Sequence, residues 1–236
     1  MKQPIFADNQ VYHVYNRGVE KRNIFLDDQD RYRFIHDLFE FNDETPAANI
    51  YYKFNKLVGF QSYEVKPRKI EREPRKTFIN ILAFCLMPNH FHLLLQQRKE
   101  NGIVKFMQKL GTGYTMSFNQ KYERSGSLFQ GTYKAILVEK DSHFIHLPYY
   151  IHLNPLDIKF PEWREREIKN YKEAMNFLEN YRWSSFPDYI GKKNFPSVTQ
   201  RKFLLDFFDG HKQYKKDTIK WLKEMNLGKI KDLILE

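Results

Sequence analysis

The chain of 236 residues contains little cysteine and no long apolar run. Cys85 is its single cysteine, so neither an intramolecular disulfide nor a zinc site made of several cysteines can form. Such usage is typical of a reducing compartment, and we expect a cytoplasmic location. Residues 1–9 lack the apolar stretch of a signal peptide, and no segment approaches the roughly 20 apolar residues that span a bilayer. We therefore expect no membrane-spanning part.

Acidic residues are also in the minority. The chain has 29 Asp and Glu against 39 Lys and Arg, which leaves a formal net charge of +10. A basic excess favours polyanionic partners, with nucleic acid first and an acidic membrane surface second. A hydrophobic content of 42% is sufficient for a core, so disorder is not expected. Most of the 15 Tyr and 21 Phe should lie in that core, and others offer faces on which unpaired bases stack.

Local patterns predict a mixed order of strands and helices. Alternating or continuous apolar residues predict strands over 10–16, 78–86, 90–96 and 133–138. Capping residues and helical apolar spacing predict helices over 27–41, 102–122 and 141–153. Residues 43–76 are predicted to form a loop with a short strand, because Pro46 and mixed charges break any period. The order predicts an α+β sandwich, a mainly antiparallel sheet with helices on one face.

The C-terminal part is charged and aromatic. We expect a helix before YRWSSFPDYIG, which ends at Gly191, and helical runs near 198–209 and 216–225 in the lysine-rich tail. The chain is therefore divided into a main domain, 1–191, and a basic helical C-terminal extension, 192–236.

The first group of residues with chemical potential is His90-Phe91-His92. On a strand, residues two apart point to the same side, so the two imidazoles would converge on one metal ion. Eight histidines in this chain produce a chance His-x-His about one time in four. The alternative is two unrelated histidines, one of them a core residue. The position at the start of a strand, directly after the turn 87–89, favours the metal site.

The second group lies on the helix that spans 143–156. His146, Tyr150 and Asn154 are four residues apart and share one face, whereas Tyr149 points elsewhere. A tyrosine one turn before an amide oxygen provides a nucleophile and a hard metal ligand from one rigid element. The alternative is an ordinary amphipathic helix with half-buried tyrosines, in which Asn154 only ends the helix before Pro155.

The two groups together fit the cleavage of a phosphodiester. A divalent cation polarises a non-bridging oxygen and stabilises the leaving 3′ oxygen. The ligand set His90, His92 and Asn154 leaves positions open for phosphate and water, and it suits Mg²⁺ or Mn²⁺. Tyr150 would form a covalent 5′-phosphotyrosine and free a 3′-hydroxyl, which preserves the bond energy for later strand joining.

Four segments, in this order and spacing, resemble the REP-associated tyrosine transposases of the HUH single-tyrosine superfamily. They are YHVYNRG at 12–18, MPNHFHLLL at 87–95, GSLFQGTYKA at 126–135 and YYIHLNPL at 149–156. The resemblance covers about 10–191, and the tail from about residue 192 matches nothing in that family.

The resemblance implies a fold, a substrate and a role for each site residue. It implies a ferredoxin-like catalytic fold over 1–191 and single-stranded DNA with a hairpin, a REP-like palindrome, as the substrate. His90 and His92 match the metal-binding histidines, Tyr150 matches the nucleophile and Asn154 matches the third metal-coordinating position. Relatives act as monomers or as homodimers, so both states remain open.

Basic residues near the strand ends are candidates for DNA contacts. They are Arg17, Lys21, Arg22 and Lys134. Cations beside a cleft would hold phosphates and make binding depend on salt. Taken one at a time, each is more often a solvated surface charge.

Three functions remain in competition. The leading hypothesis is a metal-dependent transposase that nicks and rejoins DNA next to hairpins. The first alternative is a catalytically silent module of the same fold that binds DNA or RNA hairpins. The second is a zinc hydrolase in which His143 or His146 adds a ligand, although no carboxylate base is evident in the sequence beside the histidine pair.

Overall fold

The protein is described by a computed structural model over residues 3–45, 74–139 and 141–224. The short strand expected within 43–76 falls mostly outside the described residues. Four strands were otherwise predicted, and all four are present. They are β1 (Val11–Arg17), β2 (Ile79–Met87), β3 (His90–Gln97) and β4 (Lys134–Leu137).

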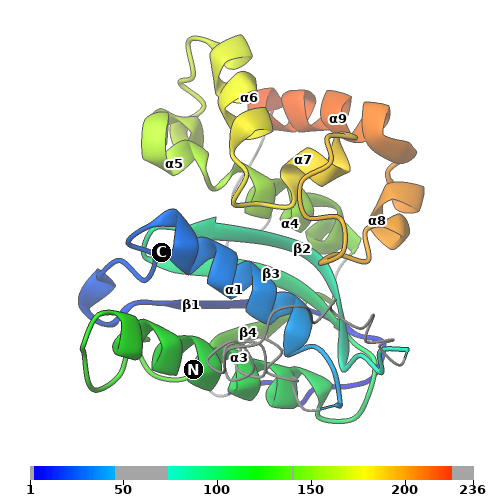
Figure 1. The fold of residues 1–236 in the computed structure, drawn as a ribbon. Coiled ribbons are helices and arrows are strands. Elements are labelled where there is room, and N and C mark those ends of the chain that lie inside the picture. The colour runs from blue at the N-terminus through cyan, green and yellow to red at the C-terminus, as the bar shows by residue number, and fades with distance from the viewer. Residues whose placement is uncertain (1–2, 46–73, 140, 225–236) are drawn as a thin grey trace, which may run out of the picture.

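The strands form one antiparallel sheet in the order β2-β3-β1-β4. Helix α1 (Asp28–Glu40) connects β1 to β2, and α3 (Gly102–Lys121) connects β3 to β4 (Figure 1). This connectivity is the split βαβ arrangement of ferredoxin-like folds. The predicted α+β class and antiparallel sheet are therefore confirmed.

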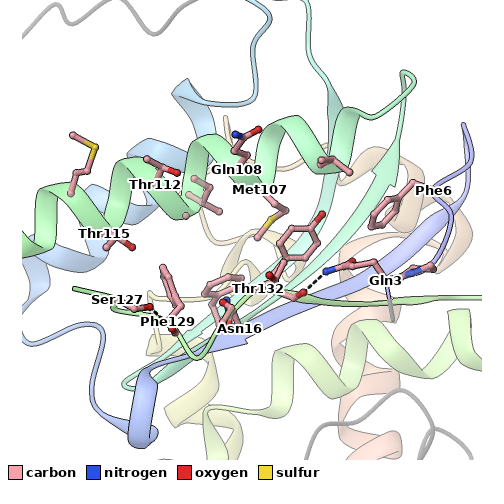
Figure 2. Close-up of a pocket in the computed structure, with 18 residues that line it drawn as sticks. Gln3, Phe6, Asn16, Met107, Gln108, Thr112, Thr115, Ser127, Phe129 and Thr132 are labelled. Carbon is pink, nitrogen blue, oxygen red and sulfur yellow. Dashed lines mark hydrogen bonds between the residues drawn. The ribbon is translucent and has the colours of Figure 1, made fainter. Parts of the chain in front are cut away.

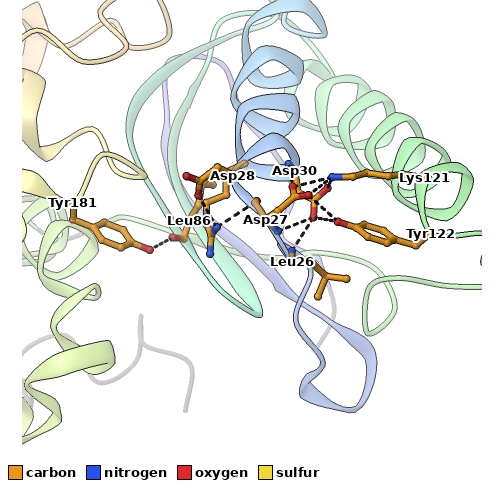
Figure 3. A network of polar contacts seen from close by, with 9 residues as sticks. Leu26, Asp27, Asp28, Asp30, Leu86, Lys121, Tyr122 and Tyr181 are labelled. Carbon is orange, nitrogen blue, oxygen red and sulfur yellow. Dashed lines mark hydrogen bonds and ion pairs between the residues drawn. The ribbon is translucent and has the colours of Figure 1, made fainter.

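Helices α1 and α3 cover one face of the sheet, where helices were expected. Their apolar stripes pack on strand residues such as Tyr12, Phe84 and Phe91 in one buried cluster. A polar contact also joins the two helices, as Figure 3 shows. Lys121 Nζ lies 2.7 Å from Asp30 Oδ1, and the Tyr122 hydroxyl donates to Asp30 Oδ2 at 2.9 Å. Because Asp30 is buried, this pairing satisfies its charge and links the start of α1 to the end of α3.

The structure adds a second helical layer on the opposite face. It begins with α4 (Asp141–Leu153), where a helix was expected, and continues through short turns and helices. These are α5 (Leu156–Lys159), the 3₁₀ helix η2 (Pro161–Glu165), α6 (Tyr171–Asn180), α7 (Phe186–Tyr189), α8 (Lys202–Phe207) and α9 (Gly210–Glu224). Figure 1 shows α5 to α9 gathered beyond α4, away from α3.

Each face of the sheet has its own buried apolar cluster, because successive residues of a strand point to opposite faces. Leu94 and Cys85 point toward α4, whereas Leu93 and Phe84, their neighbours in sequence, point toward α1 and α3. Residues of α8 and α9, such as Leu204 and Tyr214, belong to the same buried cluster as α4. The helices after Gly191 thus pack on this layer, and the division into 1–191 and 192–236 stays a prediction. No helix among the described residues is long and apolar enough to cross a membrane.

Candidate metal and nucleophile site

His90 and His92 lie on β3, an inner strand of the sheet, and point toward α4. Their ring centroids are 5.0 Å apart. The turn before them is held by long-range backbone bonds, because Gly18 N–H donates to Asn89 O at 2.8 Å and Ile24 N–H donates to Pro88 O at 2.9 Å. The strand therefore places both imidazoles on one side, as its alternation predicted.

Each of these histidines has its Nδ1 engaged by a neighbour. His90 Nδ1 lies 2.6 Å from Asn89 Oδ1, and His92 Nδ1 lies 2.9 Å from His13 Nε2. Because an amide oxygen only accepts, His90 donates from Nδ1 and carries its lone pair on Nε2. Partners of this kind orient metal-binding imidazoles. His13 was missed in the sequence, although the alternation of β1 places it on the same face as Tyr15.

Burial keeps both histidines in the neutral form. It lowers the pKa of His90 to about 4, although the charge of Asp157 acts in the opposite direction. It lowers the pKa of His92 well below its usual value, with help from His90 and His13. Neutral imidazole is the form that binds a metal.

Tyr150 extends from α4 over the histidines. Its ring centroid lies 5.8 Å from that of His92 and 6.4 Å from that of His13. Tyr149 faces another way and stacks on Tyr214 of α9, with centroids 4.8 Å apart. The structure therefore brings Tyr150, rather than Tyr149, to the histidine pair.

Asn154 follows the last residue of α4 and is fully buried. Its Nδ2 donates to the backbone oxygen of Tyr150 at 2.7 Å, and its Oδ1 has no hydrogen-bond partner. Leaving a buried amide oxygen unsatisfied costs about 1–3 kcal/mol, so this atom is poised to accept a ligand.

These residues fit a divalent cation. Two neutral imidazoles with oriented rings and one unpartnered amide oxygen are the kinds of nitrogen and oxygen donors that such a cation accepts. Across the described ranges, no group of three or more His, Cys, Asp and Glu side chains is arranged to hold a metal. No such group includes His143 or His146, so nothing in the described residues supports the zinc hydrolase built with either of them. His146 instead accepts a hydrogen bond from Trp221 Nε1 at 2.8 Å, which ties it to α9.

The charge of one carboxylate does act on His90, although no carboxylate was evident in the sequence beside the histidine pair. Asp157 on α5 is near enough for its charge to raise the pKa of His90, and it binds Arg164 of η2 through two hydrogen bonds of 2.9 and 2.7 Å. The Arg164 guanidinium carbon lies 5.8 Å from the centroid of the Tyr150 ring. No local sequence pattern indicated Arg164 as a site residue, because its contact with Tyr150 depends on the tertiary position of η2, which follows α5.

Burial and charge act in opposite directions on Tyr150. Burial raises the pKa of its hydroxyl, whereas the charge and hydrogen bond of Arg164 lower it, and the net change is upward. Burial also raises the pKa of the neighbouring Tyr15 to about 12, with a contribution from Tyr150. Both phenols are therefore protonated at neutral pH in this structure.

The four candidate DNA contacts lie near the strand ends, and their role stays a prediction. Arg17 pairs in register with His90 and donates to Gln130 Oε1 at 2.7 Å. Lys21 and Lys134 are exposed. Arg22 lies 3.2 Å from Glu20 Oε2, so its charge is partly compensated.

A cavity of about 750 Å³ opens on the other face of the sheet, beside α3 (Figure 2). Asn16 and Phe91 line it, and they alternate with the residues that point toward the histidine site. Other lining residues include Gln3, Met107, Gln108, Thr112, Phe129 and Tyr133. None of its lining residues is charged. The cavity is therefore separate from the histidine site.

Comparisons with known proteins agree with the resemblance seen in the sequence. The family model described as IS200-like transposase matches residues 63–154, less than half of the chain. The matched segment contains His90, His92, Tyr150 and Asn154, so the resemblance to these transposases is confirmed there.

No curated protein matches the chain. A solved structure of a REP-associated tyrosine transposase bound to a REP hairpin is similar in fold, with a TM-score of 0.49 and 12% identity. The match covers 84% of this chain and 89% of that chain.

Proposed function

We propose that this protein nicks and rejoins single-stranded DNA, with Tyr150 as the nucleophile and a divalent metal held by His90, His92 and Asn154. One observation carries the proposal: Tyr150 of α4 lies against the neutral histidine pair of β3, and Asn154, one helical turn after Tyr150, has an amide oxygen without a partner. The family match over the same residues supports a transposase type of DNA processing.

The chemistry follows from these side chains. When bound, Mg²⁺ or Mn²⁺ would polarise a non-bridging phosphate oxygen. The Tyr150 hydroxyl oxygen attacks phosphorus, a tyrosine–phosphorus bond forms and the bond from phosphorus to the 3′ oxygen breaks. The phenol loses its proton to solvent, and the leaving 3′ oxygen takes one up. A 3′-hydroxyl that attacks the phosphotyrosine reverses these steps and rejoins a strand.

Other residues prepare this step. Asn89 and His13 hold the imidazoles in place through the contacts at 2.6 and 2.9 Å. Arg17 and Lys134 are proposed to bind phosphates of the DNA strand that enters the site. Lys21 and Arg22 are proposed to bind phosphates farther along the same DNA strand. The substrate is proposed to be DNA with a hairpin, and the protein to act in the cytoplasm as a monomer or homodimer.

The test is a covalent adduct between the protein and DNA. A labelled single-stranded hairpin oligonucleotide is incubated with the protein and Mg²⁺ or Mn²⁺, and denaturing gel electrophoresis reveals an adduct. Tyr150→Phe should abolish the adduct, since only the attacking oxygen is removed. Tyr149→Phe removes the same atom from the adjacent residue and should retain it. An adduct that persists in Tyr150→Phe would remove Tyr150 from the proposed role.

One observation favours the alternative, a hairpin-binding module without turnover. Tyr150 is only 1% exposed, so an incoming phosphate requires α4 or its neighbours to shift. Tight binding of the hairpin with no adduct under any metal condition would establish this alternative.

A further inference from the structure

The segment that follows α4 returns to the nucleophile. It comprises α5 and η2, and it lies beyond residues 63–154, which match the family model. Arg164 lies on η2, which begins at Pro161, and its guanidinium carbon is 5.8 Å from the centroid of the Tyr150 ring. A charged residue thus reaches a buried tyrosine from a segment with no assigned role.

The Arg164 side chain is held in one orientation. Its Nε lies 2.9 Å from Asp157 Oδ1 and its Nη2 lies 2.7 Å from Asp157 Oδ2, which is a two-point contact. Trp163, which is fully buried, donates from Nε1 to the same Asp157 Oδ1 at 2.5 Å. The carboxylate is thereby fixed, and the planar guanidinium is fixed by the carboxylate.

The fixed guanidinium faces Tyr150. Its central carbon lies 5.8 Å from the Tyr150 ring centroid, and it hydrogen-bonds the Tyr150 hydroxyl. The Arg164 side chain is 24% exposed, so solvent screens its charge less than that of a surface arginine. The Tyr150 oxygen therefore meets a positive charge inside the fold.

We propose that Arg164, oriented by Asp157, is a positioning residue that aims the Tyr150 oxygen at phosphorus during nicking and stabilises its negative charge when it leaves during rejoining. In rejoining, the tyrosine–phosphorus bond breaks as the 3′-hydroxyl oxygen bonds to phosphorus and gives its proton to solvent, so the tyrosine oxygen departs as phenolate and is then protonated from solvent. A preorganised cation at that oxygen stabilises this charge more than water would. The inference rests on the proposed role of Tyr150.

The experiment measures single-turnover rates of adduct formation and of rejoining, together with hairpin affinity. Arg164→Gln should slow both rates on the order of 10²-fold, while the dissociation constant for DNA changes less than about threefold. Arg164→Lys should restore part of the rate, since it returns the charge without the two-point contact. Arg166→Gln, at an exposed arginine of the same segment, is the matched control and should leave rates and affinity unchanged.

A double-mutant cycle tests the part assigned to Asp157. Asp157→Asn should slow adduct formation by itself, and it should add little in the Arg164→Gln background, because both changes remove one oriented charge. Thermal unfolding of each variant shows whether the fold is intact, and Arg164→Lys keeps the test valid if Arg164→Gln unfolds.

Several results would overturn the inference. Nicking by Arg164→Gln at the wild-type rate would remove Arg164 from the site, and equal losses of rate and DNA affinity would make it a phosphate contact. An undiminished effect of Asp157→Asn in the double variant would mean that Asp157 acts through His90 instead. If the wild-type protein forms no adduct, the proposed function itself fails, which is a separate outcome.

Discussion

The two faces of the sheet have opposite characters although they share the same strands. On β3, Phe91 and Leu93 point toward α1 and α3 into an apolar core, and the cavity on that side has no charged lining residue. His90 and His92 alternate with them and point toward α4 and Tyr150. One strand thus provides both a packing surface and a site.

The two faces differ in whether their buried polar side chains have hydrogen-bond or ion-pair partners. On the α1 and α3 face, Asp30 is buried with its charge fully paired by Lys121. On the α4 face, Asn154 Oδ1 is buried without a partner, and His90 and His92 are neutral. The unpartnered amide oxygen and the neutral imidazoles are suited to bind a metal ion, whereas the paired Asp30 contributes to the stability of the other face.

The largest expected effect is a loss of nicking activity on changing a histidine of the α4 face. His92→Ala removes a proposed metal ligand, so metal-dependent nicking should fall by at least about 10³-fold, since a metal ion supplies several kcal/mol of transition-state stabilisation. Hairpin binding should be largely retained, because the proposed phosphate contacts lie elsewhere. Single-turnover gel assays and fluorescence anisotropy measure the two quantities.

The adjacent residue provides the control for this change. Phe91→Ala empties a buried position on the other face and should lower the free energy of unfolding by about 3 kcal/mol. The molecules that remain folded should still nick DNA. If His92→Ala unfolds the protein while Phe91→Ala abolishes nicking, the division between the faces is wrong.

An intermediate effect is expected at His13, which contacts His92 but is not a proposed ligand. His13→Phe keeps a ring of similar volume and removes the hydrogen bond, so affinity for Mn²⁺ should fall about 10- to 100-fold. Isothermal titration calorimetry measures this affinity. His36→Gln, at an exposed histidine of α1, should leave it unchanged. Unaltered Mn²⁺ affinity in His13→Phe would show that His13 only fills space.

The smallest effect concerns acid stability on the α4 face. His152 is buried between the Tyr214 hydroxyl and Ser185 Oγ, and burial lowers its pKa to about 3. Below its unfolded pKa of 6.5 the unfolded chain binds more protons than the native one, so stability should fall as the pH falls from 6.5 toward 3. The slope from one group is at most about 1.4 kcal/mol per pH unit.

Urea unfolding at pH 7.5 and 5.5 measures this dependence. Wild type should lose more stability between these values than His152→Gln, in which the titrating group is absent. The comparison of variants matters because burial raises the pKa of Asp37, on the other face, to about 6, and that group acts with the opposite sign. Equal losses in both proteins would assign the acid sensitivity to other groups.

Several parts of the site could be predicted because they depend on short-range periodicity. A period of two placed His90 and His92 on one side of β3, and helical spacing with Pro155 placed Tyr150 and Asn154 at the end of α4. The bounds of α9 were predicted less well, since the helix begins at Gly210 rather than near 216. Gly210 has a positive φ of 87°, a start that apolar spacing does not indicate.

The sequence by itself determined which side chains share an element and a face, because alternation and helical repeat act over a few residues. Only the tertiary structure decided which elements meet. His13 reaches His92 across 79 positions of sequence through strand pairing, and Arg164 of η2 comes within 5.8 Å of the Tyr150 ring of α4. Such contacts depend on the burial of whole surfaces of the sheet and helices, which no local spacing records.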